Sequence, residues 1–130
     1  MFFSHHTWLR APVAFALTAF VLLASGTTRA APAASFSEDV FPIIQIRCME
    51  CHKPDGEGYE KSGLDLSNYE GLMKGTKHGP MVIPGDPVRS NFMVMIDGRA
   101  KIRMPHGKRK LSSCEIREIR RWIKQGAKDN

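Results

Sequence analysis

The sequence predicts an all-α domain built from short helices. After residue 34, apolar residues recur at helical spacing in several segments, which begin at Ser or Asp and most of which close at glycine. Loops rich in glycine and proline separate these segments. No segment alternates apolar and polar residues as a half-buried strand would. These three observations together indicate helices joined by irregular connections.

The first predicted helix runs from about Glu38 to Arg47. Ser35 or Ser37 can cap it, because their hydroxyls can accept a first-turn N–H, and Ser35-x-x-Glu38 fits a capping box. Pro42 stands early enough to be tolerated in the first turn. The polar, glycine-rich residues 53–66 then predict a loop.

Three further helices are expected. Ser67 can cap a short one over 68–74, closed by Gly75. Asp86 followed by Pro87 predicts the start of the next, which ends before Gly98. Its expected core face is formed by Val88, Phe92, Met95 and Ile96.

The last predicted helix starts at the capping box Ser112-x-x-Glu115 and closes at Gly126. Its apolar face is formed by Ile116, Ile119, Trp122 and Ile123, and its polar face by Arg117, Arg120, Arg121 and Lys124.

Residues 1–30 have the layout of a secretory signal peptide. Arg10 precedes an uncharged apolar run over 11–24, and Thr28 and Ala30 fit the small residues before a cleavage site. We expect cleavage after Ala30, with Ala33 as the second choice. The apolar run is shorter than the roughly 20 residues of a spanning helix, so an uncleaved membrane anchor is the weaker alternative. The expected organisation is therefore a signal peptide (1–30), a linker (31–35), a folded domain (36–127) and a tail (128–130) of an exported, periplasmic protein.

Cys48-Met49-Glu50-Cys51-His52 is the C-x-x-C-H pattern of c-type haem attachment. Two cysteines three residues apart on a helical turn point in nearly the same direction, so both thiols can reach the vinyl groups of one porphyrin. The following histidine is then directed at the iron. The sequence thus predicts one haem c, attached through two thioethers, which would also supply core to a small domain.

Three other interpretations of this motif are weaker. A thioredoxin-like pair needs a βαβ context, which is missing. A structural zinc site needs four ligands, and Cys114 with His78 or His106 forms no second pair at metal-binding spacing. A plain Cys48–Cys51 disulfide would leave His52 unexplained.

The predicted sixth ligand of the iron is Met104, because methionine opposite histidine is a common pairing in electron-transfer haems. Met104 lies in an irregular loop, precedes Pro105 and comes shortly before the last helix. Met49 lies inside the motif, and Met73, Met93 and Met95 fall in predicted helices, where methionine more often packs in the core. His106 and His78 are the rival ligands.

The composition is basic, with 19 Lys and Arg against 13 Asp and Glu. Six basic residues surround Met104: Arg99, Lys101, Arg103, Lys108, Arg109 and Lys110. They predict either a solvated loop or a docking face for an acidic redox partner. No motif for nucleic-acid binding accompanies them, so we expect no nucleic-acid partner.

Several pieces of the chain together resemble class I cytochromes c, and most closely the small planctomycete-type cytochrome c domain. These pieces are Val40-Phe41-Pro42-Ile43-Ile44, the haem motif, Ser62-Gly63-Leu64-Asp65-Leu66, Val82 to Ser90, Arg103-Met104-Pro105 and Trp122 to Ala127. The resemblance implies a small helical cytochrome c fold around one haem, with the first and last helices in contact and with His52 and Met104 as axial ligands. It also implies that a proline carbonyl, of Pro80 or Pro84, orients His52.

A soluble periplasmic electron carrier, not an enzyme, is the leading hypothesis. The alternatives are a haem subunit of a larger oxidoreductase complex and a haem protein with an open sixth site. Cys114, in the first turn of the last helix, is expected to be a buried, inert thiol, with covalent dimerisation as a minor possibility. We expect no stable membrane insertion after signal cleavage.

Overall fold

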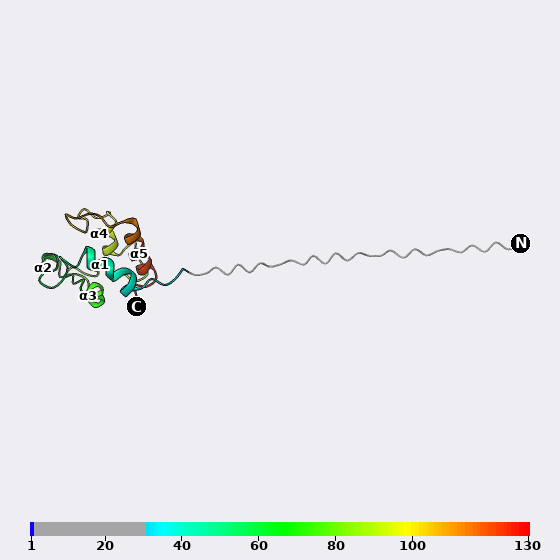
Figure 1. Ribbon diagram of the computed structural model, residues 1–130, viewed down its shortest axis with the longest axis horizontal. Coiled ribbons are helices and arrows are strands. Elements are labelled where there is room, and N and C mark those ends of the chain that lie inside the picture. The colour runs from blue at the N-terminus through cyan, green and yellow to red at the C-terminus, as the bar shows by residue number, and fades with distance from the viewer. Residues whose placement is uncertain (2–30) are drawn as a thin grey trace. The chain divides into compact units, whose positions relative to one another are not determined.

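The described part of the structure contains helices and no strand. The computed structural model describes Met1 and residues 31–130, and residues 31–130 form one unit (Figure 1). Its helical elements are η1 (Phe36–Val40), α1 (Phe41–Arg47), α2 (Glu57–Ser62), α3 (Tyr69–Lys74), α4 (Asn91–Ile96) and α5 (Ser113–Lys124). The predicted all-α class is confirmed for these residues, whereas the predicted signal peptide lies outside them. Within the described residues, no helix is both long and apolar enough to span a bilayer.

The first predicted helix forms, but as two consecutive stretches. A π-helical turn, η1, runs directly into α1, and Pro42 lies in the first turn of α1. Because proline has no N–H and its ring excludes a carbonyl four residues back, the wider turn in front of it accommodates the break. Ser35 is the N-cap, and its Oγ accepts the Glu38 N–H at 3.1 Å. Asp39, not Glu38, completes the box by accepting the Ser35 N–H at 2.9 Å.

Two segments differ from the prediction between residues 53 and 75. The predicted loop over 53–66 contains the six-residue helix α2, which begins after Gly56 and ends at Gly63 with φ of 75°. The N-cap of α3 is Asn68, whose Oδ1 accepts the Gly71 N–H at 2.7 Å. Ser67, the predicted cap, instead donates from its N–H and Oγ to Asp65 Oδ1. The predicted closure of this helix at Gly75 is confirmed.

The helix predicted to start with Asp86 as N-cap begins four residues later, with Ser90 as N-cap of α4. Asp86 Oδ1 accepts the N–H groups of Val88 and Arg89, so the Asp-Pro signal produces a single isolated turn. Val88, predicted to face the core, is 65% exposed because it belongs to that turn. Ser90 is fully buried, and its Oγ bonds the backbone of Ile83 and Asp86, which sets the start of α4.

The last helix agrees closely with its prediction. The reciprocal capping box is present: Ser112 Oγ accepts the Glu115 N–H, and Glu115 Oε2 accepts the Ser112 N–H. Ile119, Trp122 and Ile123 are buried. At the other end Gly126 has φ of 104°, and the Ala127 N–H reaches back to the Trp122 carbonyl, which is the Schellman closure that glycine permits.

An aromatic cluster joins the two ends of the domain. Figure 1 shows α5 beside α4, and α5 also packs against η1. The Phe36 ring lies 5.4 Å from the Trp122 ring and 5.2 Å from Tyr69, edge-on to the latter. The Tyr69 hydroxyl donates to the Ala127 carbonyl at 2.8 Å. The first and last helices are thus in contact, as expected.

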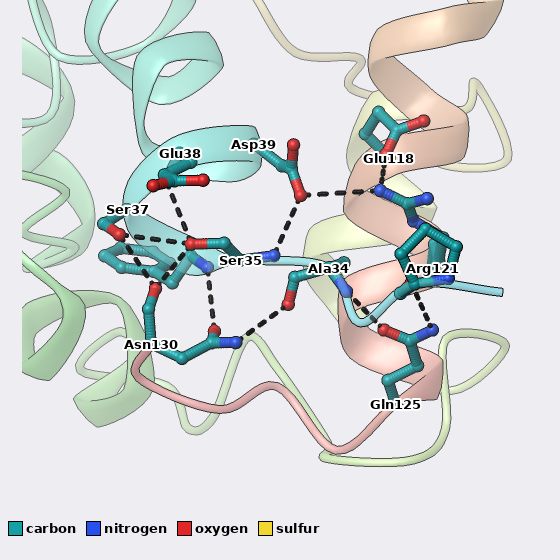
Figure 2. Close-up of polar contacts among 11 residues, drawn as sticks. Ala34, Ser35, Ser37, Glu38, Asp39, Glu118, Arg121, Gln125 and Asn130 are labelled. Carbon is teal, nitrogen blue, oxygen red and sulfur yellow. Dashed lines mark hydrogen bonds and ion pairs between the residues drawn. The ribbon is translucent and has the colours of Figure 1, made fainter. Parts of the chain in front are cut away.

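Polar contacts extend this packing beyond residues 36–127 (Figure 2). The Asn130 carbonyl accepts the hydroxyls of Ser35 and Ser37, and its side chain bonds the Phe36 N–H and the Ala34 carbonyl. Ala34 is buried, and its N–H donates to Gln125 Oε1 at 2.6 Å. The residues next to both ends of the predicted domain therefore take part in its structure.

Candidate haem site

The two motif cysteines and the motif histidine lie on the turn that follows α1. Cys48 is the C-cap of α1, and its N–H donates to the Ile44 carbonyl at 2.9 Å. The Cys48 carbonyl in turn accepts the N–H groups of Cys51 at 3.2 Å and His52 at 3.1 Å. One carbonyl thus organises the backbone of the motif, so Cys48, Cys51 and His52 lie on one turn.

Both thiols of the motif are free, and they differ from the other cysteine in burial. Cys48 and Cys51 are partly buried and form no disulfide. Burial raises the pKa of the Cys48 thiol to about 11, although the Arg47 charge beside it acts in the opposite direction. The raised pKa of Cys48 is the opposite of what a redox-active thiolate needs.

The backbone around His52 is held by segments that follow it in the sequence. The His52 carbonyl accepts the Leu66 N–H at 2.6 Å, and the Cys51 carbonyl accepts the Tyr59 N–H at 3.0 Å. Burial lowers the pKa of the His52 imidazole, and the backbone of Leu64 opposes this shift. Its Nδ1 atom is buried without a hydrogen-bond partner, and neither Pro80 nor Pro84 reaches it in the described structure. The ring is therefore packed but not oriented by a proline carbonyl here.

Two glycines let the chain pack closely against the motif. A Cβ atom at Gly58 would lie 2.8 Å from His52 Cε1 and 3.0 Å from its Nδ1. A Cβ at Gly56 would lie 2.5 Å from the Cys51 carbonyl oxygen. Sequence reasoning treated both glycines as loop residues and missed their role. The sequence did offer a signal for this role. Two glycines stand two residues apart shortly after the motif, in a segment that also holds residues that favour helix.

Met104 occupies a different environment from the two rival histidines. It is partly buried against the core, its N–H donates to the Met95 carbonyl at 3.0 Å, and buried Pro105 follows it through a cis peptide. His78 and His106 are both exposed. The remaining methionines of the folded unit pack in or against the core, apart from Met49 inside the motif: Met73, Met81, Met93 and Met95.

The six basic residues around Met104 differ in their ion pairs and in their burial. Arg99 pairs with Asp97 at 2.9 Å, and Lys108 pairs with Glu50 of the motif. The Nε atom of Arg103 is buried and has no hydrogen-bond partner. The other three are exposed, and within residues 31–130 none of them forms an ion pair with an acidic side chain: Lys101, Arg109 and Lys110.

Cys114 departs from its prediction. It is exposed, not buried, because it lies in the first turn of α5 away from the face that carries Ile119 and Trp122. Arg117 Nη2 lies 3.2 Å from its Sγ. Among the described residues, no group of three or more His, Cys, Asp or Glu side chains is arranged to hold a metal ion, so the structure offers nothing in favour of zinc.

These residues fit a covalently attached haem. Two free thiols on one turn, an imidazole whose backbone is fixed, and a partly buried thioether on the loop between α4 and α5 are the donor types of a c-type site. The orphaned Nδ1 of His52 and Nε of Arg103 are buried polar atoms of the kind that usually find a partner in a complete site.

Comparison with known proteins also points to a c-type cytochrome. A family described as planctomycete cytochrome C matches residues 48–106, which include the motif, α2, α3, α4 and Met104. No curated protein and no solved structure matches the chain. The match confirms, over residues 48–106, the similarity to planctomycete-type cytochrome c domains that was inferred from the sequence.

Proposed function

We propose that this protein is a monohaem electron carrier of the periplasm, with His52 and Met104 as the axial ligands of its haem. The observation that carries the proposal is the C-x-x-C-H turn, in which the Cys48 carbonyl organises both thiol-bearing residues and His52. Its place in a cytochrome c family domain supports the cofactor, and the predicted signal peptide supports export.

The chain's own residues have distinct roles in this proposal. Cys48 and Cys51 hold the porphyrin through thioether sulfurs, and His52 supplies an imidazole nitrogen to the iron. The haem supplies one-electron chemistry between ferrous and ferric iron. Gly58 admits the imidazole ring by leaving space beside it. The protein then needs no substrate pocket, because electron transfer requires only that the haem edge approach a partner's cofactor.

Met104 is favoured as sixth ligand by its surroundings. A ligand must be held in place, and Met104 is fixed by its backbone bond to Met95 and by the buried residue that follows it. His106 and His78 are exposed side chains of the kind that usually remain solvated. Thioether ligation stabilises ferrous iron and raises the reduction potential relative to two histidines.

The test is the absorption spectrum of the oxidised holoprotein. The wild type should show the weak far-red band of a methionine bound to ferric iron. Met104→Ala should abolish this band and lower the reduction potential, whereas the control Met73→Ala, in α3, should keep both. A band that survives Met104→Ala, or high-spin iron in the wild type, would refute the ligand assignment.

We further propose that the partner carries an acidic docking face. The exposed cations Lys101, Arg109 and Lys110 flank Met104, and charge complementarity raises association rates. The rate of electron exchange with an acidic redox partner should then fall as ionic strength rises, and a triple Gln variant should lose this salt dependence. A rate independent of salt in the wild type would exclude the acidic partner.

A further inference from the structure

The loop between α4 and α5 carries Met104, and its two halves are held differently. In the first half, the N–H groups of Ala100 and Met104 donate to carbonyls of α4 at 3.0 Å each. In the second half, residues 106–110 are all exposed, and the chain returns to the core only at Leu111. The contacts that hold residues 106–110 therefore determine how often the second half of the loop leaves its place.

Arg47 holds that second half. Its Nη2 donates to the Arg109 carbonyl at 2.6 Å and to the Lys110 carbonyl at 2.9 Å. Its side chain is only 15% exposed, and its Nε faces Glu115 Oε1 at 3.6 Å. Arg47 is the last residue of α1 and stands directly before Cys48. A single guanidinium therefore joins the haem-attachment turn, the Met104 loop and the capping box of α5.

A second contact joins the same two segments but is weaker. Glu50, inside the motif, pairs with Lys108, and the two side chains are 79% and 49% exposed. Exposed pairs of this kind contribute little, because water screens them and both side chains lose entropy. The Arg47 side chain is more shielded than either member of this pair, and its two bonds end on backbone carbonyls, which have less freedom than side-chain acceptors. Of the two contacts, that of Arg47 dominates.

We infer that Arg47 is a positioning residue that keeps the Met104 loop closed over the haem-attachment turn and thereby keeps Met104 on the iron. This inference rests on the proposed ligation by Met104. The ligation itself does not require Arg47, whose role is to lower the population of the open loop. An external ligand can replace Met104 only in the open state, so its apparent affinity reports that population.

The experiment uses the ferric holoprotein and imidazole as the external ligand. Arg47→Gln removes the double contact with the two carbonyls, and imidazole should bind at least about tenfold more tightly than to the wild type. Arg47→Lys keeps the positive charge, but its side chain ends one bond before the position of Nη2, the atom that reaches both carbonyls, so an intermediate affinity is expected. Arg117→Gln is the matched control, because Arg117 is exposed, its side chain bonds Cys114 Sγ, and it forms no ion pair within residues 31–130.

Two results separate this role from general stabilisation. Guanidinium-induced unfolding gives the free energy of unfolding of each protein. Between Arg47→Gln and the wild type, this free energy should change much less than the free energy of imidazole binding does. An unchanged imidazole affinity in Arg47→Gln, or full retention of the wild-type affinity by Arg47→Lys, would overturn the role of the carbonyl bonds. A wild-type protein without the far-red methionine band would instead overturn the ligation on which the inference rests, whatever Arg47 does.

Discussion

Gly58 provides a sharp test of how the haem turn is built. An alanine inside a helix is normally about 1 kcal/mol more favourable than glycine, so Gly58→Ala in α2 should stabilise the protein if the helix alone mattered. The structure predicts the opposite. The added Cβ would lie 2.8 Å from His52 Cε1, 2.9 Å from the Cys51 carbonyl oxygen and 3.0 Å from His52 Nδ1. All three distances are shorter than, or at the limit of, what Cβ atoms tolerate.

The size of the effect follows from these contacts. The Cys51 carbonyl oxygen is a fixed neighbour, because it accepts the Tyr59 N–H. The His52 ring is partly buried on a backbone that is tied to Leu66, so it too has little room to move aside. Overpacking of this kind costs about 1–3 kcal/mol. After the helix gain is subtracted, Gly58→Ala should be less stable than the wild type by up to about 2 kcal/mol.

The assay combines chemical unfolding with spectroscopy of the holoprotein. Far-ultraviolet circular dichroism in guanidinium measures the free energy of unfolding, and the haem spectrum reports displacement of His52. Glu60→Ala, exposed on the same helix, is the control and should stay within about 0.5 kcal/mol of the wild type. A Gly58→Ala protein that is more stable than the wild type and keeps an unaltered spectrum would refute the proposed packing.

Three further predictions test the fold around the site. Ser112→Ala removes the N-cap of α5 and should lower the free energy of unfolding by about 1 kcal/mol, measured in guanidinium, whereas Ser113→Ala should have little effect. Trp122→Phe leaves the Lys128 carbonyl without the indole N–H that reaches it at 2.8 Å, and should cost about 1–3 kcal/mol; an unchanged melting temperature would contradict this. Burial raises the pKa of Glu115, but the N–H of Ser112 and the nearby Arg47 outweigh it and leave that pKa below 4.5. The resulting stability is present above pH 4.5 and is lost as pH falls through the lower folded pKa, so Glu115→Gln should weaken the decline of stability in acid.

The haem-attachment turn and the last helix could be predicted because their signals are local. The C-x-x-C-H spacing determines which side chains share one turn, and the Cys48 carbonyl then organises that turn whatever surrounds it. The Ser112–Glu115 box and Gly126 define both ends of α5 by bonds within a few residues. These local signals, with the helical spacing of apolar residues, were enough to predict an all-α domain with a haem-attachment motif, and the resemblance of several pieces to class I cytochromes c indicated the family.

Tertiary packing decided the remaining features. A helix of six residues between Gly56 and Gly63 is too short to be stable alone. It forms because Gly56, before it, and Gly58, inside it, allow it to pack against the motif. Asp86 and Pro87 start only one turn because buried Ser90 sets the beginning of α4 through its bonds to distant backbone. Arg47 contacts carbonyls 62 and 63 residues away, which no periodicity in the sequence could indicate. The sequence alone determined which chemistry the chain carries, and only the folded chain decided what holds that chemistry in place, because those contacts join residues far apart in the sequence.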